Sequence, residues 1–331
     1  MEKKNVQMDQ REWVKIVSRF NKPDVGKSIW QIINSFGPYL LMWPVMYYSL
    51  QVSYLLTLAL AILTAGFQVR MFIIFHDCGH ESFFRSSRAN KIVGTILGSL
   101  TFTPYAYWHK EHHIHHNTVG NLDKRGHGDI TTLTVKEYQE LSNGKKLYYR
   151  IYRNPVTIFL LAPFILFVIW FRIPKKSMDR PGRYSVIISD LIIAAFSAGM
   201  ILLMGWKAFL LIQLPVIYLA TGAGVWLFYV QHQFEDVIWT RQEEWDYKQM
   251  ALEGSSFLKF PRILQWFSGN IGFHHIHHLS PKIPNYNLEK CHKSSPLFET
   301  IKPVTFVSSM RTINLRLWDE DANRLISFAQ L

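Results

Sequence analysis

The sequence predicts an all-α integral membrane protein with four transmembrane helices in two hairpins, interfacial or re-entrant segments, and a cytoplasmic histidine-rich cap. Two long uncharged stretches support this prediction. Positions 28–69 carry no charged residue, and positions 184–231 carry only Asp190 and Lys207. Since a helix needs roughly 20 apolar residues to cross a bilayer, each stretch is long enough for two spans. The whole chain, 1–331, is expected to form a single membrane domain.

The elements are expected in the following order. Residues 1–27 form a basic leader, which the positive-inside rule places in the cytoplasm. The first hairpin covers 29–75, and residues 76–183 are cytoplasmic or interfacial. The second hairpin covers 184–230 and turns at Gly205-Trp206, after which residues 231–331 return to the cytoplasmic side.

Two further apolar segments, 92–108 and 154–171, are each about the minimum length for a span and contain proline. Such segments can lie in the interface or enter the bilayer and return. Basic residues on both sides of 154–171 place both of its ends in the cytoplasm. Four crossings are therefore expected, and six remain open if both segments cross. Arg70, late in the second span, is expected to extend to the cytoplasmic surface.

Charge and cysteine content narrow the function. The net charge of +12 suits an anionic lipid surface or an acidic partner protein, and no nucleic-acid-binding motif is present. The chain has two cysteines, Cys78 and Cys291, which excludes a cluster held by four cysteines of this chain and gives no sign of a disulfide framework. No nucleic-acid partner is expected.

The histidines show a repeated pattern. The pentapeptide His-His-Ile-His-His occurs at 112–116 and again at 274–278. Residues three and four apart share one face of a helix, so each copy presents three rings in the pattern His-x-x-His-His. A competing pattern in the first copy would use His109 and His113, but the second copy has Ile271 at the position that matches His109. The shared pattern is therefore preferred.

With His76 and His80 after the second span and His232 after the last one, nine imidazoles gather on the cytoplasmic side. Nine are too many for one tetrahedral ion and suit two. Imidazole binds iron, copper, nickel and zinc, so the ligand type leaves the metal open. The predicted ligands are His76, His80, His112, His115, His116, His232, His274, His277 and His278.

Other polar residues are assigned lesser roles. Asp77 is expected either to hydrogen-bond a ligand ring or to cap a helix, and Asn270 to support the site through water. His113 and His275 are expected to be outer donors to the site or solvated side chains. His109, His127 and His292 are expected to be structural or surface residues.

The motifs resemble a known family. His76-Asp-Cys-Gly-His80 and the two His-x-x-His-His patterns are similar to the three histidine boxes of membrane fatty-acid desaturases. The segments 120–126, 226–236, 269–278, 279–286 and 317–321 resemble bacterial acyl-lipid desaturases. The resemblance covers nearly the whole chain and is closest to the cold-induced phospholipid desaturases of Bacillus, which include a Δ5-selective member.

This resemblance implies a non-haem di-iron centre that uses O2 and two electrons to place a cis double bond in phospholipid acyl chains, of Δ5 type or alternatively Δ10. It implies a role in membrane fluidity during cold adaptation, at the bacterial plasma membrane with the site facing the cytoplasm. It also implies a further histidine ligand outside the boxes, and His232 is the candidate by position. In animal relatives an asparagine stands four residues before that histidine, whereas this chain has Phe228.

The electrons must come from another protein, because the chain has no dinucleotide-binding glycine fingerprint and no flavin motif. Ferredoxin or flavodoxin is the expected donor. Two rival functions are hydroxylation of an acyl chain or alkane by the same centre, and metal transport. A transporter places its ligands in broken helices near the bilayer midplane, whereas the predicted spans here contain no histidine.

Overall fold

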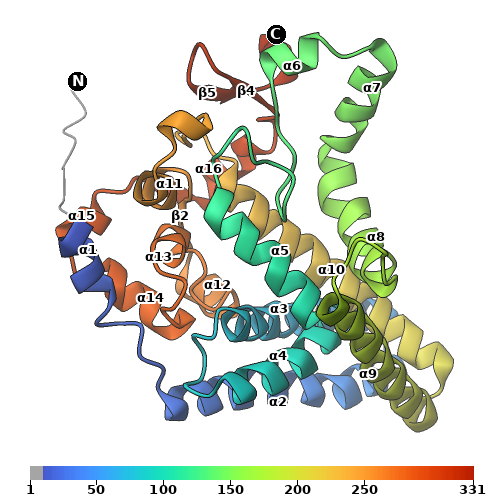
Figure 1. Ribbon diagram of the computed structural model, residues 1–331. Helices are drawn as coiled ribbons and strands as arrows, with labels where there is room; N and C mark the ends of the chain where they lie inside the picture. The colour runs from blue at the N-terminus through green and yellow to red at the C-terminus, as the bar shows by residue number, and fades with distance from the viewer. Residues whose placement is uncertain (1–9) are drawn as a thin grey trace.

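The computed structural model describes residues 10–331, so the first nine residues of the predicted leader lie outside the described part of the chain. The described chain is mostly helical (Figure 1). Its four longest helices are α2 (Val25–Ser49), α3 (Tyr54–Gly79), α9 (Arg180–Met204) and α10 (Trp206–His232). They form the two predicted helix pairs, and the second pair turns at Gly205, whose φ of +80° favours glycine.

Within residues 10–331, three helices are long and apolar enough to cross a membrane: α3, α9 and α10. A fourth candidate is the bent pair formed by Asn143–Tyr152 and Thr157–Arg172, whose halves differ in direction by 55°. Helix α2 is not in this set, and polar residues such as Gln31 and Asn34 lower its hydropathy. The membrane location and the count of four crossings stay predictions.

Aromatic packing joins the two helix pairs. Trp43 of α2 is buried and stacks on Phe209 of α10, with ring centroids 5.8 Å apart. Large buried rings contribute most of the apolar contact in such interfaces. Helix α3 lies between α2 and α10 and contacts both.

The segment 92–108 is a broken helix. Helix α4 (Ser87–Leu100) ends before a kink, and α5 (Tyr105–Thr118) begins directly after Pro104. Phe102 in the kink has a φ of +59°. A Cβ on Gly98 would lie 2.6 Å from the Phe75 ring, so only glycine lets α4 approach α3 so closely.

The segment 154–171 is also irregular. After α7 (Asn143–Tyr152), a π-helical turn η1 (Thr157–Leu161), helix α8 (Ala162–Val168) and a 3-10 turn η2 (Trp170–Arg172) follow. Arg172 bonds to Asp190 of α9 at 2.7 Å and to the carbonyl of Phe102 at 2.8 Å. These bonds tie the end of the segment to α9 and to the kink before α5.

The remaining chain forms the cap. Its helices are α1 (Gln10–Val17), α6 (Val135–Gln139), η3 (Gln242–Glu244), α11 (Tyr247–Glu253), α12 (Arg262–Phe267), α13 (His274–Leu279), α14 (Asn285–His292), α15 (Pro296–Glu299), α16 (Phe306–Thr312) and η4 (Phe328–Gln330). Its strands are β1 (Leu133–Thr134), β2 (Phe257–Lys259), β3 (Pro303–Thr305), β4 (Leu317–Asp319) and β5 (Arg324–Ile326). Strand β4 pairs in parallel with β1 and antiparallel with β5, and β2 pairs in parallel with β3. The all-α prediction missed these two small sheets.

The prediction that Arg70 extends to the surface is wrong. Arg70 is buried, donates to Ser35 Oγ at 3.0 Å and to the carbonyl of Trp266, and lies 3.9 Å from the centroid of the Trp266 ring. A buried guanidinium needs such partners, and here they fasten α12 to α3.

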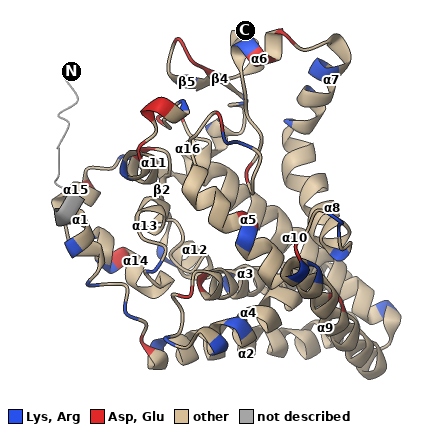
Figure 2. Ribbon diagram, viewed as in Figure 1, with Lys and Arg blue, Asp and Glu red and all other residues tan. Residues whose placement is uncertain are grey.

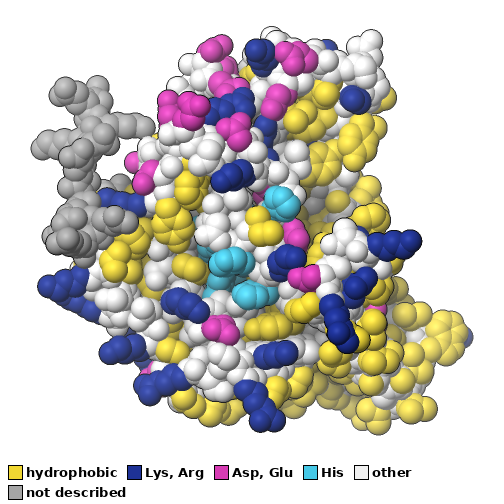
Figure 3. All heavy atoms as spheres, in the orientation of Figure 1, with side chains coloured by type: hydrophobic (Ala, Val, Ile, Leu, Met, Phe, Trp, Pro, Cys, Tyr) yellow, Lys and Arg dark blue, Asp and Glu magenta, His cyan; other side chains and the backbone are white. Residues whose placement is uncertain are grey.

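Charge is distributed unevenly over the molecule. Figure 2 shows few charged residues along α9 and α10 and many on the cap. Figure 3 shows apolar side chains covering the surface around α9, while histidines and basic residues reach the surface near the centre of the same view. This separation agrees with an apolar helical part and a polar cap.

Candidate metal centre

Four helix segments bring the nine predicted ligands together. His76 lies in the last turn of α3 and His80 is the residue that ends it; His232 is the last residue of α10. His76 and His232 therefore lie in the last turns of long helices, just beyond the ends of the predicted spans at residues 75 and 230. The remaining six come from α5 and α13, and all nine rings are buried.

Five rings form the first histidine group: His76, His80, His112, His116 and His277. One ring nitrogen of each lies within 4.8 Å of the others. The Nε2 atom of His116 is 3.1 Å from that of His112 and 3.0 Å from that of His277. The nitrogens therefore converge on one point.

Four rings form the second histidine group. His115, His232 and His278 have ligand nitrogens within 4.8 Å of one another. The Nε2 atom of His274 lies 3.0 Å from the Nε2 atoms of both His232 and His278. The same nine residues that the spacing indicated thus divide five and four.

The two groups touch each other. His115 and His116 are neighbours in the chain but belong to different groups, and so do His277 and His278. The rings of His116 and His278 stack with centroids 4.1 Å apart. Two ions held by these groups would be close neighbours.

The rings are suited to ligate a metal. Burial, and next the neighbouring imidazoles, lower the pKa of His80, His112, His115, His116, His274, His277 and His278 well below the usual value. Neutral imidazole is the form that binds metal. The Nε2 atom of His80 is buried and has no hydrogen-bond partner among the described residues. An unsatisfied buried nitrogen costs about 1–3 kcal/mol, and a bound cation would satisfy it.

Asp77 connects the first group to the cap. Its Oδ1 lies 3.2 Å from His76 Nδ1, and its Oδ2 accepts from the backbone N–H of Asn285 at 2.7 Å and from Asn285 Nδ2 at 2.8 Å. Asn270, with a φ of +60°, donates to the Asn285 carbonyl at 3.2 Å and does not contact the rings directly. The carboxylate of Asp77 can fix which nitrogen of His76 faces the metal.

The other histidines lie outside both groups. His113 is exposed and lies near Asn117, and His109 stacks on Tyr105. His127 is half-exposed and lies 3.5 Å from Glu111. The pattern with His109 and His113 as ligands is thus disfavoured.

His275 corrects an expectation. It is neither solvated nor in hydrogen-bond contact with the nine rings, since its Nε2 pairs with Nδ1 of buried His292 at 3.1 Å. Burial, and next His292, lower the pKa of His275 to about 3. The two rings pack beside Phe257 and belong to the core of the cap.

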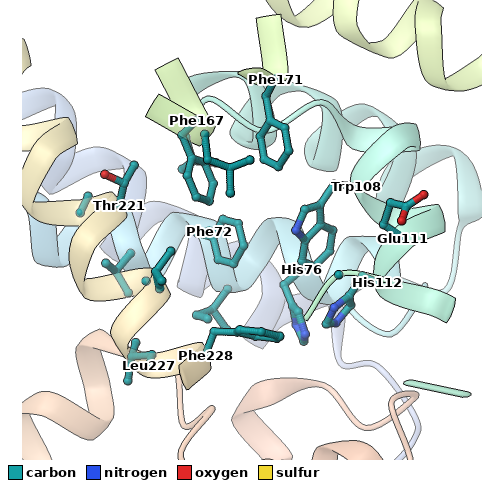
Figure 4. Close-up of a pocket in the computed structure, with 18 of the residues that line it drawn as sticks. Phe72, His76, Trp108, Glu111, His112, Phe167, Phe171, Thr221, Leu227 and Phe228 are labelled. Carbon is teal, nitrogen blue, oxygen red and sulfur yellow. The ribbon is translucent and has the colours of Figure 1, made fainter. Parts of the chain in front are cut away.

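A cavity of about 420 Å³ reaches the histidines. His76, His112 and His274 line it, and the walls also include the aromatic rings of Phe72 and Phe167. Figure 4 shows His76 and His112 on one side of this cavity and Thr221 of α10 on the other. An elongated apolar group could lie in the cavity with one part against the metal centre.

The sequence analysis predicted no contact with the histidines or with Asp77 for three residues near the site. Asn285 holds Asp77, Trp108 stacks on His112 with centroids 4.3 Å apart, and Phe228 lies beside His115 and His232. Asn285 belongs to the segment 279–286, which the sequence analysis had singled out as a motif without a role. Trp108 precedes His112 by four residues, a helical spacing that could have indicated the contact.

Comparison with known proteins gives a consistent result. The sequence model of the fatty acid desaturase family matches residues 52–305. A fatty acid desaturase of Bacillus subtilis (strain 168) is 47% identical over 328 residues, which cover 99% of this chain and 93% of that protein. An endoplasmic-reticulum omega-3 fatty acid desaturase of Vigna radiata is 30% identical, over 68% of this chain and 60% of that protein. An sn-1 acyl-lipid omega-3 desaturase (ferredoxin) of Nostoc sp. (strain 36) is 27% identical, over 75% of this chain and 69% of that protein.

Proposed function

This chain belongs to the fatty acid desaturase family and is an oxidoreductase, and from that premise we propose that it introduces a cis double bond into the acyl chains of membrane phospholipids with O2 as co-substrate. The observation that carries the proposal is the pair of buried histidine groups opening onto an apolar cavity.

The proposed cofactor is two iron ions. His76, His80, His112, His116 and His277 would hold one, and His115, His232, His274 and His278 the other. Iron with O2 supplies the oxidant that an unactivated C–H bond requires. Nine neutral nitrogen donors in two adjacent groups support two ions of a metal that accepts imidazole.

The protein's own contribution is to hold the acyl chain. Apolar and aromatic side chains of α3, α8 and α10 line the cavity and would exclude water from the chain. Only the carbons beside His76, His112 and His274 would then meet the oxidant, because small displacements of the reacting atoms strongly reduce the rate. We propose a Δ5 product, with Δ10 as the alternative, and a role in maintaining membrane fluidity in the cold.

The proposed electron donor is ferredoxin or flavodoxin. The net charge of +12 suits an acidic carrier protein, and the Nostoc relative bears ferredoxin in its name. The proposed location is the bacterial plasma membrane, with the cap, including residues 231–331, on the cytoplasmic side. The single-domain organisation over 1–331 belongs to the same proposal.

Expression in a bacterial host without desaturases tests the function. With a ferredoxin or flavodoxin system supplied, mass spectrometry of the lipids should show a new double bond in phospholipid acyl chains, and the purified protein should carry two irons per chain. An empty vector is the control. Unchanged lipids despite a reduced donor and iron-loaded protein would refute the proposed function, and hydroxylated chains would redirect it to the rival oxidation.

A further inference from the structure

The cavity beside the histidines has one exposed, polar end. Tyr107 and Glu111 of α5, the loop residues Gly126, Gly128 and Asp129, and Trp170 of η2 line this end. By contrast, Gln68, Val69 and Thr221 at other parts of the lining are buried. Figure 4 shows Glu111 near His112 and on the opposite side from Thr221. This polar end, which we call the cavity mouth, lies close to the metal centre.

A lysine is held over the cavity mouth. Lys175 Nζ lies 4.2 Å from the centroid of the Trp170 ring and 5.9 Å from that of the Tyr107 ring. Both rings line the cavity, and contacts of a cation with aromatic faces fix the position of the ammonium group. In residues 10–331 no carboxylate lies within ion-pair distance of Lys175. The ammonium group is therefore available to an anion that enters the mouth.

The carboxylates nearest to the mouth do not pair with Lys175. Glu111 acts on Lys175 only at longer range, and its Oε2 lies 3.5 Å from His127 Nδ1. Asp129 is held within its own loop, where its Oδ1 accepts from the backbone N–H of Gly126, and it forms no ion pair with Lys175. The nearby Lys110 is paired with Asp179 at 2.8 Å. Lys175 is thus a cation beside the mouth that forms no ion pair with a carboxylate of residues 10–331.

We propose that Lys175, braced on Trp170 and Tyr107, binds the phosphate of the glycerophospholipid whose acyl chain occupies the cavity. This inference rests on the proposed function and adds the part of the substrate that the protein recognises outside the cavity. Lys175 follows η2, where exposed Ile169, Trp170 and Ile173 are suited to the membrane interface, the depth at which lipid phosphates lie.

The test compares two substrates with identical acyl chains. Dipalmitoyl phosphatidylglycerol and dipalmitoylglycerol, which lacks the phosphate, are offered in nanodiscs to the full-length enzyme with its electron donor. The variants are Lys175→Gln, Lys175→Arg as the charge-conserving rescue, and Lys176→Gln as the matched control on the neighbouring exposed lysine. Iron content is measured for each to show that the metal centre is intact.

We expect Lys175→Gln to lower kcat/KM for the phospholipid about tenfold, mainly through KM, as for loss of one charge-assisted hydrogen bond. Its activity on dipalmitoylglycerol should be unchanged, Lys175→Arg should restore the preference, and Lys176→Gln should match wild type. Equal rates of Lys175→Gln and Lys176→Gln on the phospholipid would overturn the inference while leaving the desaturase function standing. Inhibition of wild type by inorganic phosphate without any preference for phospholipid would also overturn it, since Lys175 would then bind a free anion. A wild type inactive on both lipids would instead count against the proposed function.

Discussion

Asp77→Asn tests how the carboxylate beside the metal centre supports His76. Asp77 is buried and accepts three hydrogen bonds, one from His76 and two from Asn285. The asparagine side chain has the same shape but only one acceptor oxygen, and its amide nitrogen donates. If the nitrogen takes the place of Oδ2 it faces both donors of Asn285, and if it takes the place of Oδ1 it faces His76 Nδ1.

At least one buried donor then loses its partner, at a cost of about 1–3 kcal/mol. Loss of a group that orients a ligand typically weakens metal binding about 10–100-fold, which corresponds to about 1.4–2.7 kcal/mol. The free-energy cost of the unpaired donor and the free energy that corresponds to weaker metal binding are thus of similar size. We therefore expect the iron dissociation constant of the Asp77→Asn protein to rise about 10–100-fold, with activity partly restored by excess iron.

The assay is competition with a chelator, followed by elemental analysis of the purified protein and measurement of desaturation. Asp179→Asn is the matched control, because Asp179 is an exposed carboxylate with an ion pair to Lys110 and lies outside the centre. If Asp77→Asn retains iron as firmly as this control, the reasoning that the carboxylate orients His76 is refuted.

Three further predictions follow from the geometry. His277→Ala should lose iron and all desaturation while still inserting in the membrane, whereas His109→Ala should keep most activity; a dead His109 variant would revive the other spacing pattern. Gly98→Ala should lower the free energy of unfolding by about 1–3 kcal/mol, because its Cβ would overlap a packed ring, whereas Gly224→Ala meets nothing within 4 Å and should leave thermal unfolding unchanged. Finally, His275 has a folded pKa of about 3 against about 6.5 unfolded. Because the unfolded chain then binds more protons, the metal-free protein should lose stability as pH falls from 6.5 toward 3. A His275→Gln variant should show a shallower decline, and an equally steep one would argue against this assignment.

The three histidines that share a helix face in each pentapeptide could be predicted, because they lie within five residues of one another in the sequence. His112, His115 and His116 lie on one helical face by spacing alone, and comparison with the second copy at 274–278 removed His109 and His113 from consideration. The structure brings these rings together with His232, which helical spacing could not connect to them and which was placed by its position after a span.

Other features depend on contacts between distant segments, which the sequence does not display. His275 repeats the chain position of His113, yet His275 is buried against His292 and His113 is exposed, because all of α13 is buried whereas one face of α5 meets solvent. Arg70 was predicted to lie at the membrane interface. Its actual partner, the carbonyl of Trp266, is distant in the sequence and could not be inferred from it. Likewise, nothing in the sequence indicated that Asn285 lies against Asp77, 208 positions earlier.

The division of neighbouring histidines between the two groups bears on how the protein acquires its metal. His115-His116 on α5 and His277-His278 on α13 each give one ring to each group, so the backbone that sets the ligands of one ion also sets those of the other. Binding the first ion would order both helices and so prepare the second position before it is filled. Metal uptake should therefore be cooperative, with a steep titration curve and little singly loaded protein at intermediate iron.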